Sequence, residues 1–388
     1  MNVLFAHDHI FYKYKDNYYS NGGLSRDVLL RYTNVFGKAT LITRQKEIMD
    51  YDSNLTLAST KNIDFIDIPN FKSASKFKNI HNAKKIIEEN VKQCDYLIAR
   101  LPSSIGKIAV KYAKKYNKPY VVEVVGCAWD ANWNYGSTIG KLIAPYEFFS
   151  NKNAILDSKY TIYITKFFLQ SRYPSKGQVA VCPNVNIKPV DNIILEKRKK
   201  KINKNLQPIK FGLIGSLDVN YKGHEIVIKA LGMLKKRNID FKIEFLGKGD
   251  LNRWKNLIAK NNLQENVDFI GTLPSGDQVY KWIDTIDVML QPSKAEAQGR
   301  SIIEAMSRGC TIIASKVGGI VELIEDEWLI NSGDYIDLYN KITRLVKSKE
   351  QMLNQATKNF DESKYYYSRR IESTRIEFLN KLINESVF

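Results

Sequence analysis

The residues best suited to chemistry lie in one short segment, EAQGRSIIE, which runs from Glu296 to Glu304. It follows the apolar run Val288–Leu290 and leads into a stretch of helical periodicity, so we expect a turn between a buried strand and a helix. Gly299 permits a tight turn, and the first N–H groups of a helix have no partner within the helix. The segment therefore predicts an anion site.

The side chains around this turn extend the site beyond an anion. Arg300 and Ser301 stand at the start of the expected helix and add a positive charge and a hydroxyl. Glu296 and Glu304 would repel a phosphate, but carboxylates accept hydrogen bonds from neutral hydroxyls. A sugar ring, a diphosphate and a ribose would satisfy all of these groups. The alternative is a simple helix cap with Glu304 as a surface residue.

Apolar β-rich runs alternate with helical stretches along the chain, which predicts an α/β protein with parallel sheets covered on both faces. The expected strands are Val3–Ala6, Ala39–Ile42, Phe65–Ile68, Tyr96–Ala99, Tyr120–Val124, Thr161–Ile164, Val179–Cys182, Lys210–Ile214, Phe241–Leu246, Val267–Ile270, Val288–Leu290 and Thr311–Ala314. Two doubly wound, Rossmann-like domains are therefore expected, facing each other across a cleft that holds the ligand at the carboxyl ends of the strands.

A stretch rich in Pro, Asn and Lys interrupts this alternation and predicts a linker. The expected divisions are a first domain over 1–185, a linker over 186–208, a second domain over 209–363 and a terminal helix over 364–388 that crosses back to the first domain.

The chain has 388 residues and a formal net charge of +18. Residues 1–200 hold 31 basic and 17 acidic residues, a balance of +14, and the remainder has a balance of +4. This asymmetry favours an anionic partner, although a lysine-rich composition alone could produce it. The four scattered cysteines suggest neither zinc nor disulfides, so a cytoplasmic protein is expected. The His7–His9 segment is interpreted as a loop that closes the first strand.

Several residues of the first half lie in or after predicted strands and are candidate polar or backbone contacts of a ligand. Gly22 and Gly23 form a turn before a predicted helix. Arg100 follows a strand directly and is a candidate anion contact, and Glu123 lies in the strand Tyr120–Val124. Asp130 could orient or deprotonate a ligand hydroxyl, or it could cap the next helix. A structural role remains equally open for Arg100 and Asp130.

Three motifs of the second half together resemble the group 1 (family 4) retaining glycosyltransferases of the GT-B fold. The first is the pair Glu296 and Glu304 with seven residues between them, followed by Ala-Met and then Gly. The second is GLIGSLDVNYKGHEIVIKAL at 212–231, and the third is FLGKGDLNRW at 245–254 with VDFIGTLP at 267–274. The resemblance is strongest over about 210–320.

The resemblance implies a nucleotide-sugar donor site in the second domain. Glu296 would contact the donor sugar, Lys222 would neutralise the leaving phosphate, and Glu304 would bind the ribose. Asp130 is the candidate catalytic group on the acceptor side, and the candidate contacts for the acceptor or the diphosphate are Gly22, Gly23, Arg100 and Glu123. The donor-binding residues would be Gly215, Ser216, Lys222, Gly247, Gly249, Leu273, Gln298, Gly299, Arg300, Ser301 and Glu304.

One position departs from the family pattern. The family commonly has an arginine six residues before the lysine, and Ser216 stands there in this chain. Our hypothesis is that Arg300 supplies the missing charge.

The sequence thus predicts a metal-independent, retaining hexosyltransferase that needs no cofactor and uses a UDP- or GDP-linked sugar. The acceptor would be a hydroxyl of a bacterial surface glycan such as lipopolysaccharide or capsule, with a lipid-linked form included. The basic segment 71–85 is compatible with peripheral contact with an anionic membrane, and the alternative is a solvated lysine-rich loop and helix. The alternatives are a nucleotide-sugar epimerase of the same fold and a basic nucleic-acid-binding protein, although no nucleic-acid module is recognised.

Overall fold

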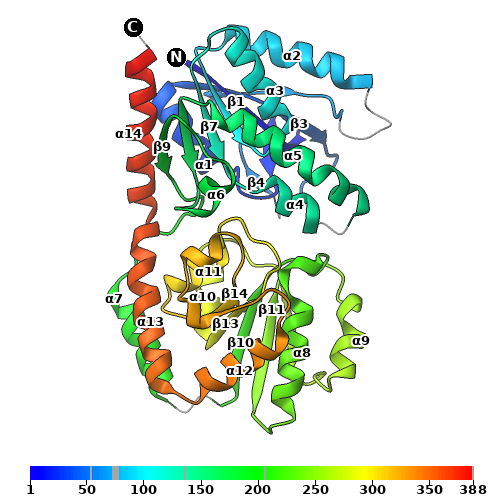
Figure 1. Ribbon diagram of the computed structural model, residues 1–388, viewed down its shortest axis with the longest axis vertical. Coiled ribbons are helices and arrows are strands. Elements are labelled where there is room, and N and C mark those ends of the chain that lie inside the picture. The colour runs from blue at the N-terminus through cyan, green and yellow to red at the C-terminus, as the bar shows by residue number, and fades with distance from the viewer. Residues whose placement is uncertain (53–54, 72–77, 135–136, 205–206, 387–388) are drawn as a thin grey trace. The chain divides into compact units, whose positions relative to one another are not determined.

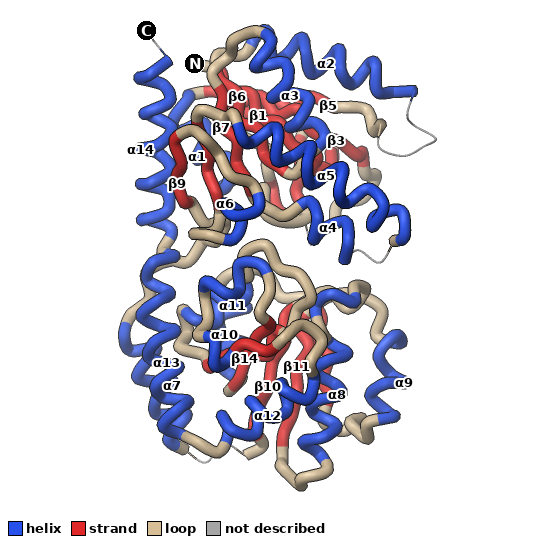
Figure 2. Tube along the Cα trace, viewed as in Figure 1, coloured by secondary structure: helices blue, strands red, loops and turns tan. Residues whose placement is uncertain are grey.

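The computed structural model describes residues 1–52, 55–71, 78–134, 137–204 and 207–386, which form two compact units. Unit 1 comprises Met1–Ala128, Tyr146–Cys182 and Glu372–Phe388, and unit 2 comprises Trp129–Pro145 and Pro183–Ile371. Each unit is an α/β structure in which strands and helices alternate, as Figures 1 and 2 show.

Unit 1 contains a parallel sheet with the strand order β5-β3-β1-β6-β7-β8-β9. Its strands are β1 (Asn2–Tyr14), β3 (Lys38–Glu47), β5 (Ile63–Asp67), β6 (Tyr96–Leu101), β7 (Tyr120–Val124), β8 (Tyr160–Tyr163) and β9 (Gln178–Val181). Strands β2 (Asn17–Ser20) and β4 (Thr56–Leu57) extend the sheet through antiparallel pairing. The near-continuous apolar runs of β1, β3 and β6 are buried because helices cover a parallel sheet on both faces.

The helices of unit 1 connect successive parallel strands. They are α1 (Arg26–Phe36), α2 (Ile80–Gln93), α3 (Ser104–Lys115), α4 (Ala128–Asn134), α5 (Thr138–Leu156) and α6 (Phe168–Arg172). Helix α3 packs against α2, and Lys107 of α3 forms an ion pair with Glu147 of α5 at 2.8 Å. Of these helices, α4 from Trp129 onward and the part of α5 up to Pro145 belong to unit 2.

The first strand is longer than its apolar core suggests. His7 and His9 lie within β1, and the pairing with β3 shifts register between Ala6 and Ile10. The expected loop at His7–His9 is therefore wrong: the polar residues sit at a β-bulge, which re-aims side chains without ending a strand. Residues 72–77 of the segment 71–85 lie outside the described residues.

Unit 2 contains a parallel sheet with the order β12-β11-β10-β13-β14-β15. Its strands are β10 (Ile209–Ile214), β11 (Phe241–Leu246), β12 (Val267–Gly271), β13 (Val288–Gln291), β14 (Thr311–Ser315) and β15 (Leu329–Ile330). This is the doubly wound order: strands are added on one side of β10 as far as β12, and from β13 onward they are added on its other side. Ligands are therefore expected at the carboxyl ends of β10 and β13. The short strand β15 was not predicted.

The helices of unit 2 are α7 (Asn192–Asn203), α8 (His224–Lys235), α9 (Asn252–Lys260), α10 (Asp277–Thr285), α11 (Arg300–Met306), α12 (Tyr335–Val346) and α13 (Lys349–Ser363). The prediction that 186–208 is only a linker is wrong, because α7 packs against α13 and buries Leu195, Arg198 and Ile202. Arg198 donates hydrogen bonds to the carbonyl oxygens of Ile283, Ile286 and Arg308. Helix α14 (Ser368–Ser386) begins in unit 2, and its residues from Glu372 onward belong to unit 1.

Candidate functional site

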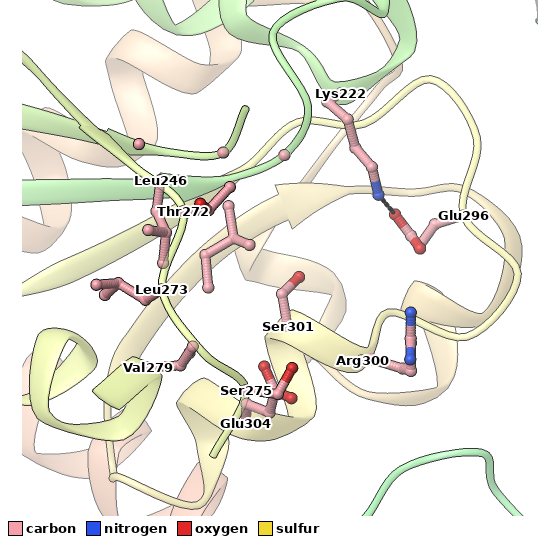
Figure 3. Close-up of a pocket in the computed structure, with 14 residues that line it drawn as sticks. Lys222, Leu246, Thr272, Leu273, Ser275, Val279, Glu296, Arg300, Ser301 and Glu304 are labelled. Carbon is pink, nitrogen blue, oxygen red and sulfur yellow. Dashed lines mark hydrogen bonds and ion pairs between the residues drawn. The ribbon is translucent and has the colours of Figure 1, made fainter. Parts of the chain in front are cut away.

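A cavity of about 340 Å³ lies at the carboxyl ends of β10, β11 and β12, beside the start of α11 (Figure 3). This volume is within the usual range for small-molecule sites. Figure 3 shows Leu246, Leu273 and Val279 on one side and Lys222, Glu296 and Arg300 on the other. The lining residues are Ile214, Gly215, Lys222, Leu246, Gly247, Gly271, Thr272, Leu273, Ser275, Val279, Glu296, Arg300, Ser301 and Glu304.

Two glycines let the strand ends approach each other closely beneath the cavity. A Cβ on Gly247 would lie 1.9 Å from the carbonyl oxygen of Gly215, and one on Gly215 would lie 2.8 Å from Cβ of Lys222. Any larger side chain at Gly247 would therefore push β10 and β11 apart at their ends. These two glycines allow the close approach of the backbone, and other residues supply the polar side chains of the site.

Lys222 ends a 3₁₀ turn (Asn220–Lys222) that precedes α8. The next residue, Gly223, has φ 87°, and a Cβ there would meet the carbonyl oxygen of Pro292 at 2.2 Å. The turn therefore requires glycine. It directs the Lys222 side chain to Glu296, with 2.7 Å between Nζ and Oε2 and relative side-chain exposures of 19% and 17%.

The loop that carries Glu296 is fixed by two further backbone contacts. The amide of Lys294 donates to the carbonyl oxygen of Tyr221, and the amide of Gly319 donates to that of Glu296. A Cβ on Gly318 would lie 1.6 Å from the same Glu296 oxygen. The sequence did not reveal this support, because Gly318 and Gly319 lie more than twenty positions downstream.

Gly299 has φ 83° and precedes α11, in agreement with the predicted turn. Arg300 is exposed at the first position of the helix, and Ser301 lies within hydrogen-bonding reach of Gln291, 3.4 Å from Oγ to Oε1. Glu304 lies one turn further along α11 and its carboxylate enters the cavity beside Ser275 (Figure 3). Burial raises the pKa of Glu304, and the nearby Arg300 partly offsets this.

The cavity thus brings together most of the predicted donor-site residues. Seven of the eleven line it, and so does Glu296, the residue expected to contact the donor sugar; the seven are Gly215, Lys222, Gly247, Leu273, Arg300, Ser301 and Glu304. Ile214, Leu246, Gly271, Thr272, Ser275 and Val279 also line it and were not predicted. Their only sequence signal is position, because most of them end a strand or follow one directly, where the edge of a parallel sheet collects side chains.

Four predicted donor residues support the cavity without lining it: Ser216, Gly249, Gln298 and Gly299. Ser216 donates a hydrogen bond to the carbonyl oxygen of Lys248 and accepts one from the Asp218 amide. Gly249 has φ 139° beside Asp218. Gln298 is buried and its Oε1 accepts from the Asn184 amide at 3.0 Å. Gln298 therefore holds the backbone of Asn184, and its buried Nε2 has no hydrogen-bond partner among the described residues.

The candidate residues of the first half lie in different elements of the fold. Gly22 and Gly23 lie in the turn before α1, where the Gly22 amide donates to Ser20 Oγ at 3.3 Å. The Arg100 side chain is buried, with 5% of the residue exposed, and its Nε and Nη1 have no hydrogen-bond partner among the described residues. Asp130 lies in the first turn of α4.

Glu123 is not an acceptor contact, and that prediction is wrong. Its carboxylate is buried and accepts hydrogen bonds from Tyr32 and from Arg375 of α14, the latter at 2.7 Å. Arg375, Arg100 and Arg31 hold the pKa of Glu123 below its usual range despite its burial. The sequence placed Glu123 correctly in a strand but did not show that α14 covers it.

Within the described part of the chain, no group of three or more His, Cys, Asp or Glu side chains has the arrangement of a metal site. Among the same residues, no helix has both the length and the apolar character needed to cross a membrane.

Comparisons with known proteins agree with this architecture. The family model described as "Glycosyl transferases group 1" matches residues 195–362. Protein CapJ of Staphylococcus aureus is 34% identical over 395 residues, covering 99% of this chain and 97% of CapJ. The amylovoran biosynthesis glycosyltransferase AmsK of Erwinia amylovora is 30% identical over 157 residues, covering 38% of each chain.

A solved structure extends the likeness to the whole fold. Anabaena HepE in complex with UDP and glucose superposes with a TM-score of 0.63 at 14% identity, covering 100% of this chain and 98% of HepE. The expected GT-B fold class, with two Rossmann-like α/β units, is confirmed. The match over almost the full length of CapJ and the family model over unit 2 place the chain in the group 1 glycosyltransferases.

Proposed function

We propose that this chain is a retaining, family 4 glycosyltransferase that moves a hexose from a nucleoside diphosphate sugar to a hydroxyl of a bacterial surface glycan. The observation that carries the proposal is the cavity of unit 2, where Lys222, Arg300, Glu296 and Glu304 line one space at the carboxyl edge of the sheet. The name of AmsK and the ligands of HepE support a glycan product and a UDP-linked donor.

Each part of the donor is assigned to different side chains of the cavity. The apolar side of the cavity, with Leu273 and Val279, suits a nucleobase, and the Glu304 carboxylate would accept hydrogen bonds from ribose hydroxyls. Lys222 and Arg300 would face the diphosphate, and Glu296 would face hydroxyls of the sugar.

Departure of the nucleoside diphosphate is the step that these cations would assist. As the bond from the anomeric carbon to the phosphate oxygen breaks, negative charge grows on the diphosphate. Cations already held in place stabilise that charge without reorganisation, and such electrostatic stabilisation commonly contributes more to catalysis than any other single effect. In this proposal Lys222 and Arg300 supply the charge, and neither a metal ion nor another cofactor takes part. EDTA should then leave turnover unchanged.

A thermal-shift panel with UDP, GDP, ADP and CDP tests the donor site directly. A ligand at about 100 times its dissociation constant stabilises the folded state by about 2.7 kcal/mol, which shifts Tm measurably. We expect one diphosphate to raise Tm, and the rise to shrink in Glu304→Ala and Lys222→Ala. Absence of any shift at millimolar concentrations, with saturable and salt-sensitive binding to nucleic acid, would contradict the proposal.

The stereochemical part of the proposal needs a separate measurement. Proton NMR of the product formed from UDP-glucose, or from the sugar linked to whichever base the panel identifies, reports the anomeric configuration. Retention predicts the same configuration in the product as in the donor. Inversion would refute the family 4 assignment while leaving the glycosyltransferase assignment intact.

A further inference from the structure

A further cavity, of about 470 Å³, lies within unit 1 and is larger than the cavity of unit 2, which measures about 340 Å³. It is formed where β7 and β8 begin, between the C-terminal ends of α3 and α14. We call it the amino-edge cavity. Its volume is within the usual range for small-molecule sites.

The position of the amino-edge cavity separates it from the proposed reaction. Strands β7 and β8 are parallel and begin at Tyr120 and Tyr160, both of which line the cavity. The cavity therefore lies at the amino edge of the sheet, whereas the substrates of doubly wound domains bind at the carboxyl edge. A ligand of this cavity would thus be neither the sugar donor nor the acceptor.

The floor of the cavity is apolar and held by packing. Ala113, Tyr160 and Leu382 line it and are only 0%, 2% and 1% exposed. Tyr160 packs edge-on against Phe378 of α14, with 5.8 Å between the ring centroids, and its hydroxyl donates a hydrogen bond to Glu385. These contacts join the end of α14 to β8, so the floor is formed before any ligand binds.

The rim of the cavity is basic. Lys114, Lys118 and Lys159 line it, and none of the described residues that line it is acidic. Lys118 donates to the carbonyl oxygen of Cys94, whereas Lys114 is exposed and has no ion-pair partner among the described residues. Lys159 lies 3.5 Å from Glu385, but the two side chains are 66% and 35% exposed, and such surface pairs are weak. Lys114 and Lys159 are therefore available to an anion.

We propose that the amino-edge cavity binds a small aromatic anion that is not a substrate of the transferase. The rings of Tyr120 and Tyr160, together with Leu382, receive the flat apolar body, because aromatic side chains favour stacked or edge-on contact with another ring. The ammonium groups of Lys114 and Lys159 meet the acidic group at the rim through charge-assisted hydrogen bonds. The inference is independent of the donor proposed for unit 2.

A second copy of the chain is a poorer occupant of the cavity. A stable protein interface takes about 20–30 residues from each partner, far more than line this concave site. In a two-fold dimer the same surface meets itself, so the rim lysines of the two copies would face one another. A small anion avoids this repulsion because its charge is negative.

Fluorescence titration of the full chain with anilinonaphthalene sulfonate, an aromatic anion whose emission rises on binding, tests the inference. Lys114→Gln combined with Lys159→Gln, the rim variant, should raise the dissociation constant of this probe about tenfold or more, because charge-assisted contacts are lost. Lys114→Arg combined with Lys159→Arg keeps both charges and should bind like the wild type. Probe bound elsewhere on the surface would not respond to these substitutions.

Two matched controls separate the cavity charges from charge in general. Lys84→Gln combined with Lys111→Gln removes two exposed lysines of α2 and α3 that do not line the cavity, and this variant should bind like the wild type. Phenylnaphthylamine has the same rings as the probe but no sulfonate. It should bind the wild type more weakly than the sulfonate does, and equally in the rim variant.

Three outcomes would overturn the inference. They are equal affinity of the rim variant and the wild type for the sulfonate, equal affinity of the wild type for the sulfonate and its uncharged analogue, and a wild-type dimer in light scattering that the rim variant converts to monomer. The diphosphate-induced Tm shift of the rim variant should equal that of the wild type, which excludes misfolding. Binding of the sulfonate through the rim without any diphosphate shift would support this inference and contradict the proposed function.

Discussion

Lys222 and Glu296 lie 74 positions apart in the chain and form an ion pair of 2.7 Å within the cavity of unit 2. Each is the nearest opposite charge for the other, and both are mostly shielded from solvent. A donor diphosphate would compete with Glu296 for the ammonium group of Lys222. The pair therefore holds the lysine in place before the donor arrives, and it leaves Arg300 as a cation of the cavity lining with no ion-pair partner among the described residues.

Replacement of Lys222 should affect catalysis far more than folding. For Lys222→Ala we expect kcat to fall about 10²–10³-fold, the loss typical when one preorganised group that stabilises developing charge is removed. Steady-state kinetics measures this. Lys229→Ala is the control, because Lys229 forms a similar ion pair with Glu225 but lines no part of the cavity.

The coupling between Lys222 and Glu296 can be measured by a double-mutant cycle. Each single alanine variant leaves one partly buried charge unpaired, whereas the double variant removes both. We expect a coupling free energy of about 0.5–3 kcal/mol from urea unfolding. Additive effects of the two substitutions would show that the pair contributes nothing to stability.

Arg300→Ala tests whether this arginine provides the charge missing at Ser216. A hydrogen bond to a charged group contributes about 1.5–3 kcal/mol, so the dissociation constant of the preferred nucleoside diphosphate should rise about 10- to 100-fold. Calorimetric titration reports it. Arg237→Ala is the control, since Arg237 is exposed in the turn after α8 and does not line the cavity. An unchanged dissociation constant of the diphosphate in Arg300→Ala would refute the hypothesis that Arg300 supplies the charge missing at Ser216.

We expect the ionised Glu304 carboxylate to destabilise the folded chain and to strengthen binding of the nucleoside diphosphate. Burial raises its pKa, so the folded chain holds this proton more tightly than the unfolded chain. The stabilisation that comes from binding this proton is therefore fully present below the ordinary carboxyl pKa, and it is lost as the pH rises through the raised pKa. Glu304→Gln should therefore raise Tm near neutral pH, and the gain should shrink as the pH falls toward about 4. The same variant should bind the diphosphate more weakly.

Glu225→Gln gives a control of opposite sign for this pH profile. Lys229 lowers the pKa of Glu225, so that carboxylate stabilises the folded chain above its ordinary pKa. We expect Glu225→Gln to lower Tm slightly at neutral pH. A Tm of Glu304→Gln below that of the wild type at neutral pH would show that its charged form is stabilised in the fold.

Gly318→Ala should lower kcat although Gly318 does not line the cavity. The new Cβ would lie 1.6 Å from the Glu296 carbonyl oxygen at φ 53°, so the loop carrying Glu296 must move. A displacement of about 1 Å at a catalytic group can cost about 10²-fold in rate. Gly333→Ala is the matched control, because Gly333 also has a positive φ, 91°, but no atom lies within 4 Å of its Cβ position. Both variants bear backbone strain, and only Gly318→Ala should lose kcat.

Local patterns predicted most strands and the donor residues that follow them. Short apolar runs with β-rich composition identify buried parallel strands, and residues just after such strands gather at one sheet edge by topology alone. For this reason Glu296, Arg300 and Glu304 could be grouped before their contacts were known, whereas Lys222 was added to them by the resemblance to the group 1 glycosyltransferases. The same reasoning failed for the linker: a run of lysines and asparagines looks like a solvated connector, whereas α7 needs only Leu195, Arg198 and Ile202 on one side to pack against α13.

The sequence by itself determined the α/β class, the order of most elements and the turn at Gly299, because these depend on periodicity and on backbone conformations that few residues can adopt. Only the tertiary structure decided the partners of charged side chains. Glu123 and Arg375 are 252 positions apart, and Gly318 meets the Glu296 loop across 22 positions. No local pattern encodes such pairs, since a side chain's partner is chosen by the packing of distant segments and by the cost of burying a charge alone.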